Sequence, residues 1–125
     1  MPFEKLEDKR IYRRAEAVAD RVWRIVASWQ WFAQQTVGRQ WVTATDSIGA
    51  NVAEAGGRFH PGDVRNFLYY SRGSMREAKY WMRRAVERNL IDENTCKEID
   101  QELEQLSCEI NASISFQKTR RIRGT

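Results

Sequence analysis

Residues 46–86 read DSIGANVAEAGGRFHPGDVRNFLYYSRGSMREAKYWMRRAV, and this stretch predicts the end of one helix, a tight connection and the start of a longer helix. The first helix should stop at Gly56-Gly57, because glycine after a helix can adopt the left-handed conformation that other residues resist. The next should begin at Pro61, whose ring already fixes a helical φ and whose missing N–H would have no partner in the first turn. Asp63 then places a carboxylate near the positive end of the helix dipole.

The longer helix is amphipathic. Apolar residues recur three and four positions apart from Val64 to Val86, with Ser71 and Ser74 as small members of the same face, which predicts about seven turns ending near Asn89. A second set of residues lies along one line well away from that face and is basic, with two tyrosines. We call this set the basic stripe: Arg65, Tyr69, Arg72, Arg76, Lys79, Tyr80 and Arg83.

The order and spacing of several short motifs resemble those of a known family. The residues that carry the resemblance are Ser47-Ile48, Asn51-Val52-Ala53-Glu54, Gly57-Arg58, Phe67-Leu68 and Arg72-Gly73-Ser74 with Glu77. They are similar to the four-helix bundle proteins first noticed as the open reading frame inside intervening sequences of bacterial 23S ribosomal RNA, over roughly residues 3–116. The chain departs from that pattern only in the connection, at Ala55, where the family usually has glycine, and at His60-Pro61, where it often has a serine cap.

This resemblance implies a ring-forming homo-oligomer, typically a pentamer. The accessory variability proteins of diversity-generating retroelements are similar in fold, and the resemblance implies a basic ring surface that engages a reverse transcriptase and nucleic acid. A fivefold ring would multiply a modest basic patch into a large one. The core motif of this chain is nearer the intervening-sequence branch, and in most members no activity is established.

Three further helices are predicted outside the opening stretch. The first covers residues 9–32, and its apolar seam is Ile11, Ala15, Val18, Val22, Ile25, Trp29 and Phe32. Residues 33–40 are polar with a central glycine and should hold the first turn, before a second helix over residues 41–55 whose inward seam is Trp41, Ala44, Ile48, Val52 and Ala55. The last helix should be capped by Asp92, with a seam of Cys96, Ile99, Leu103, Leu106, Ile110 and either Ile114 or Phe116.

Four helices with short connections favour an all-α, antiparallel up-down-up-down four-helix bundle. We expect one domain over residues 1–118 and a basic C-terminal tail over residues 119–125. Gly49 and Gly73-Ser74 are expected where helices approach closely, since glycine inside a helix costs roughly 1 kcal/mol against alanine. Trp23 and Trp31 lie beside the first seam, where they either shield the core or contact a second subunit.

Composition excludes several classes of protein. No run of about 18 apolar residues is present and the N-terminus resembles no secretory signal, so we expect a cytoplasmic protein. Cys96 and Cys108 would lie about 18 Å apart along one helix, too far for a disulfide, and should be reduced thiols. Because His60 is the one histidine and the cysteines are not clustered, we predict no metal site and no cofactor.

Charge is unevenly distributed along the chain. Residues 1–91 hold 16 basic and 10 acidic side chains, residues 92–109 hold one lysine and seven acids, and residues 110–125 hold four basic side chains. Two interpretations of the basic stripe remain open. In one, basic side chains bind nucleic-acid phosphates while Tyr69 or Tyr80 stacks on a base. The basic side chains would be Arg65, Arg72, Arg76, Lys79, Arg83 and Arg84. In the other, the stripe pairs with acids of the last helix, such as Glu98, Glu102 and Glu109, in the same subunit or a neighbour.

Polar residues near the inward faces need a separate interpretation. Glu54 and Glu77 could serve an enzyme as paired carboxylates, but no nucleophile, metal ligand or second histidine accompanies them. We therefore interpret Asn51, Glu54, Arg58 and Glu77 as a structural polar network that fixes the second helix against the third. The sequence predicts a non-enzymatic bundle that presents basic surface to RNA or DNA. The alternative is a structural or protein-binding scaffold, such as an accessory subunit of a reverse transcriptase or ribonucleoprotein.

Overall fold

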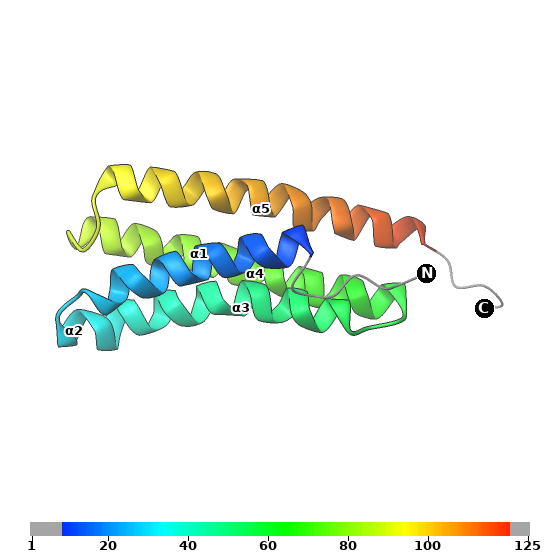
Figure 1. Cartoon of the computed structure of the whole chain (residues 1–125), viewed down its shortest axis with the longest axis horizontal. Coiled ribbons are helices and arrows are strands. Elements are labelled where there is room, and N and C mark those ends of the chain that lie inside the picture. The colour runs from blue at the N-terminus through cyan, green and yellow to red at the C-terminus, as the bar shows by residue number, and fades with distance from the viewer. Residues whose placement is uncertain (1–8, 121–125) are drawn as a thin grey trace.

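Four long helices lie side by side and alternate in direction (Figure 1). The structure is a computed structural model that describes residues 9–120. The long helices are α1 (Arg10–Ala27), α3 (Arg39–Gly56), α4 (Pro61–Glu87) and α5 (Glu93–Thr119), and a short helix α2 (Trp31–Ala33) and a π-helical segment η2 (Gln34–Gly38) lie between α1 and α3. The predicted all-α four-helix bundle is confirmed.

The helices are ordered α1, α3, α4, α5 around the bundle axis, and α5 also contacts α1. One apolar stripe from each helix is buried between them, which is the arrangement that the heptad-like spacing predicts. The predicted α3 seam is buried throughout, from Trp41 to Ala55. In α5, Ile114 completes the seam, whereas Phe116 is 61% exposed.

The predicted turn at residues 33–40 is wrong. The chain turns at residues 28–30, directly after α1, and is helical again from Trp31 onward. Phe32 therefore lies beyond the turn and is 73% exposed, so its place in the first seam is also wrong. The polar composition of residues 33–40 reflects a helical segment at the end of the bundle, where fewer residues face the core.

Two side-chain contacts explain why this segment is helical. The Gln34 side-chain amide donates through Nε2 to the carbonyl oxygens of Val26 (3.2 Å) and Ala27 (3.1 Å), which are among the last carbonyl acceptors of α1. At Gly38 an added Cβ would lie only 2.6 Å from Val26 Cγ1. The glycine that suggested a turn is instead required for close packing of η2 against α1.

The connection between α3 and α4 begins and ends where the sequence predicts. The helix α3 ends at Gly56, and Pro61 is the first residue of α4 with Asp63 in its first turn. However, Gly57 has φ −91°, so the predicted left-handed glycine is wrong. The left-handed residue lies instead after α4, at Asn89 (φ 60°), an asparagine, which tolerates this conformation better than most residues.

Asp92 caps α5 as predicted. Its Oδ1 accepts a hydrogen bond of 2.7 Å from the Thr95 backbone N–H, and this bond lowers the pKa of Asp92. Both cysteines are free thiols, with Cys96 buried and Cys108 exposed. The prediction of reduced thiols therefore agrees with the structure.

Two predicted close contacts have different outcomes. An added Cβ at Gly49 would lie 3.4 Å from Ala15 Cβ, so α1 and α3 do meet there. A Cβ added at Gly73 would have no atom of another described element within 4 Å, so the predicted packing point is wrong and this side of α4 is open. The helix α5 continues to Thr119, one residue into the predicted tail, while residues 1–8 and 121–125 of the predicted domain and tail lie outside the described residues.

Candidate nucleic-acid interface

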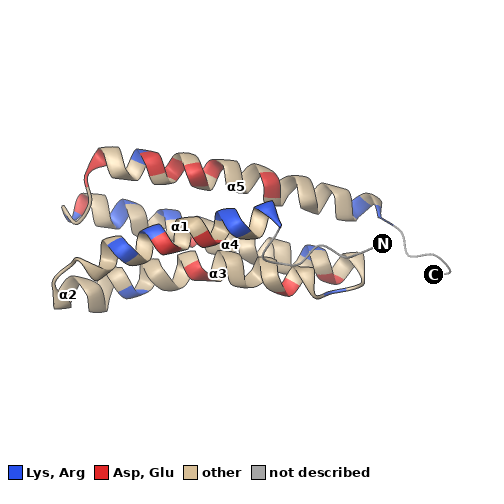
Figure 2. Ribbon diagram, in the orientation of Figure 1, with Lys and Arg blue, Asp and Glu red and all other residues tan. Residues whose placement is uncertain are grey.

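The basic stripe lies along the side of α4 that adjoins α5. Arg65 donates to the Gln117 carbonyl oxygen (3.2 Å) and Arg72 to Asn111 Oδ1 (3.1 Å), both on α5. Figure 2 shows that the acidic residues of α5 gather along the first half of that helix, with fewer toward its C-terminal end. The two halves of the stripe therefore face different electrostatic surroundings.

In the half near the start of α4, the stripe cations contact neutral groups. The Arg72 guanidinium lies 5.0 Å from the centroid of the Tyr69 ring, a cation–π contact worth about 0.5–1 kcal/mol at an exposed site. This contact covers one face of Tyr69. Tyr80, which is 57% exposed and packs edge-on against Trp81, is the more accessible of the two tyrosines for a stacked base.

Two cations of the predicted set are paired with carboxylates. Lys79 contacts Glu104 and lies 3.4 Å from Asp100 Oδ1, and Arg84 contacts Glu87. Partial burial lowers the pKa of Lys79, but the hydrogen bond to Glu104 and the two carboxylate charges outweigh it and raise the pKa overall. Lys79 is thus firmly cationic, with its charge largely neutralised inside the chain.

Arg76 and Arg83 differ from these, because both are exposed and neither has an ion-pair partner within residues 9–120. The positive charge of Arg83 interacts electrostatically with the buried Cys96 thiol. Burial raises the pKa of Cys96, and the positive charge of Arg83 partly opposes that shift. Together with Arg72, these residues leave three exposed guanidinium groups on α4 without a carboxylate.

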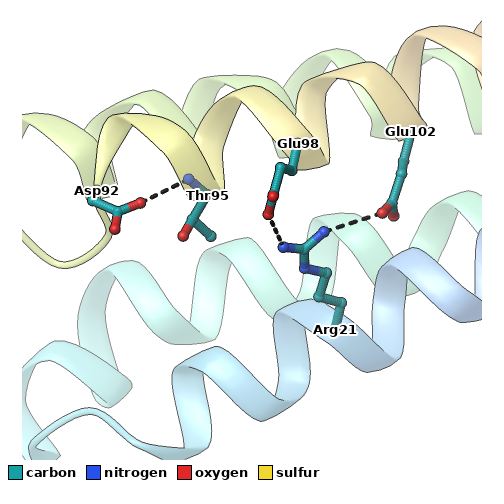
Figure 3. Close-up of polar contacts among 5 residues, drawn as sticks. All are labelled: Arg21, Asp92, Thr95, Glu98 and Glu102. Atoms are coloured by element: carbon teal, nitrogen blue, oxygen red, sulfur yellow. Dashed lines mark hydrogen bonds and ion pairs between the residues drawn. The ribbon is translucent and has the colours of Figure 1, made fainter.

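Within the described chain the three acids named as partners of the stripe bind α1 instead, whereas Lys79 does pair with two other acids of α5, and pairing with a neighbouring subunit stays a prediction. Arg21 donates to Glu98 (2.5 Å) and Glu102 (3.1 Å), as Figure 3 shows, and Arg14 Nε lies 2.6 Å from Glu109 Oε1. The hydrogen bond to Glu98 is the main cause of the raised pKa of Arg21. The seven-residue spacing of Arg14 and Arg21, two turns apart on one side of α1, was the signal available in the sequence.

The four residues of the predicted polar network are not joined into one cluster. Asn51 donates to the Ser47 carbonyl oxygen (2.9 Å), one turn earlier in α3. Arg58 and Glu54 form an exposed pair at 3.1 Å, and the Arg58 guanidinium lies 4.6 Å from the centroid of the Phe67 ring. Glu77 is exposed, and no hydrogen bond or ion pair in the described part of the chain connects it to the other three.

Other chemistry that the sequence raised has no assembled site. Within residues 9–120 no group of three or more histidine, cysteine or acidic residues could hold a metal ion. His60 precedes α4 as its N-cap residue and packs edge-on against Phe59. None of the described helices combines the length and the apolar character needed to cross a bilayer.

Comparisons with known proteins show one family and a shared fold. Residues 7–112 match the family model of the 23S rRNA-intervening sequence protein. A solved structure of a protein of unknown function from the S23 ribosomal protein family of Bacteroides thetaiotaomicron is similar, with a TM-score of 0.74 and 18% sequence identity. The similarity covers 83% of this chain and 97% of that one, and at this identity it shows a shared fold. No curated protein matches the chain.

Proposed function

The chain belongs to the 23S rRNA-intervening sequence protein family, and from this premise we propose that it is a non-enzymatic, homo-oligomeric bundle that binds RNA or DNA through the basic stripe. The observation that carries the proposal is the set of exposed guanidinium groups on α4 that lack a carboxylate partner among the described residues: Arg72, Arg76 and Arg83. Arginine in this state suits phosphate, because its planar fork donates two parallel hydrogen bonds. Tyr80 adds an exposed ring for a base.

The distribution of the acids supports this choice over an internal role for the stripe. Three of the α5 carboxylates pair with Arg14 and Arg21 on α1, and those that pair with the stripe contact one member of it, Lys79. The ion pairs of Arg14 and Arg21 join α1 to α5, and these two helices contact each other less than the other neighbouring long helices do. The pairs therefore strengthen the smallest interface between long helices of the bundle. The remaining arginines on α4 are therefore left free to contact an external anion.

Assembly into a ring would strengthen a surface of this size. Three arginines per subunit without a carboxylate partner in residues 9–120 give weak electrostatic binding alone, but copies arranged in a ring present them at high effective concentration to one nucleic-acid molecule. Trp31 and Phe32 on α2 are 72% and 73% exposed, which favours a protein contact at that end of the bundle. We propose a homopentamer by resemblance to the family.

A salt series with matched variants tests the proposed function. One variant replaces Arg72, Arg76 and Arg83 by glutamine, and the control replaces Arg13, Arg24 and Arg88, which are also exposed and whose replacement removes the same charge. The affinity for a mixed-sequence RNA hairpin, measured by fluorescence anisotropy, should fall steeply with salt for the wild type. The stripe variant should lose roughly 2 to 3 units of the slope of log K against log salt, since each phosphate contact contributes about 0.9.

The control variant decides the interpretation. It should keep most of the slope, because its arginines lie elsewhere on the bundle. Equal losses in the two variants would mean that only net charge matters, and no binding by the wild type even at low salt would end the nucleic-acid proposal.

The second candidate is a structural or protein-binding scaffold, including an accessory subunit of a reverse transcriptase. The exposed aromatic residues of α2 favour it, because large apolar side chains that are mostly in water mark contact surfaces. Sedimentation equilibrium of the wild type and of Trp31→Ser separates self-assembly from this role. An assembled wild type that dissociates on substitution supports a contact between copies, whereas a monomer in both cases favours a different protein partner.

A further inference from the structure

A groove of about 390 Å³ lies at the α2 end of the bundle, between α1, η2 and α3. Its lining includes Trp23 and Val26 from α1, Gln34 from η2, and Arg39, Val42 and Thr43 from α3. The volume is within the range of about 300–1,000 Å³ that is typical of small-molecule sites, and such sites combine apolar walls with a few polar groups. The groove is separate from the basic stripe, which lies on α4.

The π-helical segment shapes this groove. Such segments are rare and often occur at functional sites, because the wider turn displaces side chains from their α-helical positions. Here η2 packs so closely on α1 at Gly38 that no Cβ would fit against Val26. The wall of the groove is therefore fixed by the packing of Gly38 against the Val26 side chain.

Gln34 presents a fixed hydrogen-bond acceptor in the groove. Its Nε2 already donates to two carbonyl oxygens of α1, so the side chain is held in place. No hydrogen bond to its Oε1 occurs within the described residues, so this oxygen is available to a ligand. An amide oxygen in this state accepts a bond from an amino group, such as the exocyclic amine of a nucleobase.

Trp23 supplies an aromatic wall, and Arg39 supplies the charge. Trp23 is 61% exposed, so much of its indole is accessible to a planar ring. Arg39 is exposed, has no ion pair within residues 9–120, and lines a groove that contains no carboxylate. An indole for stacking, an amide acceptor and a free guanidinium are the groups that recognise a nucleobase carrying a phosphate.

We propose that this groove binds one nucleoside monophosphate unit, either as a free nucleotide or as an unpaired nucleotide of a strand. The base stacks on Trp23 and donates its exocyclic amine to Gln34 Oε1, while the phosphate contacts Arg39. This site goes beyond the proposed function, because it needs neither the stripe nor a ring.

The test uses 2-aminopurine riboside 5′-monophosphate and a single-stranded tetranucleotide containing that base, because stacking on indole quenches its fluorescence. The wild type should quench the probe. Trp23→Ala should weaken binding about ten- to a hundredfold, the range expected for a lost base–aromatic stack. Trp23→Phe should keep part of the binding, and Trp31→Ala should keep all of it, because Trp31 is more exposed than Trp23 but does not line the groove.

A second comparison tests the phosphate contact and separates the two sources of ligand. Arg39→Gln should weaken the monophosphate several-fold but leave the unphosphorylated riboside unchanged. Similar affinity for both probes assigns the site to any nucleotide unit, whereas preference for the tetranucleotide assigns it to a strand. The Arg72, Arg76 and Arg83 variant should quench normally, so this proposal and the stripe proposal can fail independently.

Three results would overturn the proposal: no quenching by the wild type at millimolar protein, equal quenching by Trp23→Ala, or equal loss in Trp31→Ala. A fourth is self-association that Trp23→Ala abolishes without any nucleotide binding. That result would assign the groove to contact between copies of the chain.

Discussion

The hydroxyl of Ser71, in the middle of α4, donates a hydrogen bond of 2.8 Å to the backbone carbonyl oxygen of Ile48 on α3. Both residues are buried, with exposed fractions of 0% and 1%. Serine inside a helix usually bonds within its own helix, so a bond across the interface is a specific choice. It fixes the register of the two helices that carry the family motifs, and it requires a small residue at this position of the seam.

Ser71→Ala should therefore lower the free energy of unfolding by about 0.5–1.5 kcal/mol, the usual net value of a buried hydrogen bond. Chemical denaturation of the wild type and the variant measures this difference. Ser115→Ala on α5 is the control, since Ser115 is exposed and alanine favours helix, and it should be neutral or slightly stabilising. Equal effects at the two positions would show that the bond to Ile48 contributes nothing.

Two glycine substitutions should change stability in opposite directions. Gly38→Ala should cost about 1–3 kcal/mol, the range for overpacking, because its Cβ would meet Val26 at 2.6 Å. Gly73→Ala should stabilise by about 0.5–1 kcal/mol, because that helix position is open and alanine loses less conformational freedom on folding. Thermal unfolding of both variants checks the signs. A stabilising Gly38→Ala would contradict the close packing of η2 on α1.

The Asp92 cap should make stability depend on pH. Its pKa is lowered in the folded chain by the Thr95 hydrogen bonds, so its contribution is present above the unfolded pKa of about 3.9 and is lost as pH falls through the folded value. Asp92→Ala should thus lower the melting temperature at pH 7, by an amount that shrinks below about pH 4. Asp92→Asn keeps a capping oxygen and should lose less at pH 7. A pH-independent deficit in Asp92→Ala would contradict the assignment.

Asp46 should act in the opposite direction. Partial burial, and then the charge of Asp20, raise its pKa in the folded chain, so ionisation of Asp46 disfavours folding as pH rises above the unfolded pKa. Asp46→Asn should therefore raise the melting temperature at pH 7 and have little effect near pH 3. Asp63→Asn removes the same charge from an exposed position at a helix start, where a carboxylate is favourable, and should not stabilise.

The sequence predicted well the features that depend on periodicity and on local capping. The seams of α3 and α5, the start of α4 at Pro61 and the Asp92 cap follow from spacing or from one residue's backbone preference, which act over a few positions. The first turn could not be located in this way. Gly38 is compatible both with a turn and with close packing, and only the position of Val26 across the interface distinguishes them.

The candidate site was less predictable than the fold for a related reason. The line of basic residues on α4 follows from helical periodicity, but their partners depend on which acids of α5 lie opposite them. Arg21 pairs with Glu98 and Glu102, and Lys79 pairs with Asp100 and Glu104, whereas Arg76 has no carboxylate partner within residues 9–120. Pairing across helices depends on rotation and register, which single-helix patterns do not contain.

This pairing predicts unequal effects within the stripe. Arg76→Gln should weaken RNA binding more than Lys79→Gln, although both remove one positive charge from the same side of α4. The Lys79 charge is already balanced by Glu104 and Asp100, so Lys79→Gln leaves two unpaired carboxylates that repel phosphate only modestly at physiological salt. Arg76 can contact an RNA phosphate and so release a counterion condensed on the RNA. Its replacement by glutamine should therefore reduce the slope of log K against log salt by about 0.9.

A third variant, at Glu104, tests whether its ion pair with Lys79 limits RNA binding. Glu104→Gln removes the strongest partner of Lys79 and should free its charge, so RNA affinity should rise, while Glu104→Gln combined with Lys79→Gln should return it to about the wild-type value. Glu93→Gln, at the exposed start of α5, removes a carboxylate that has no ion pair among residues 9–120 and should change affinity less. If Arg76→Gln and Lys79→Gln weaken binding equally at every salt concentration, the internal pairs do not select which cations reach the nucleic acid.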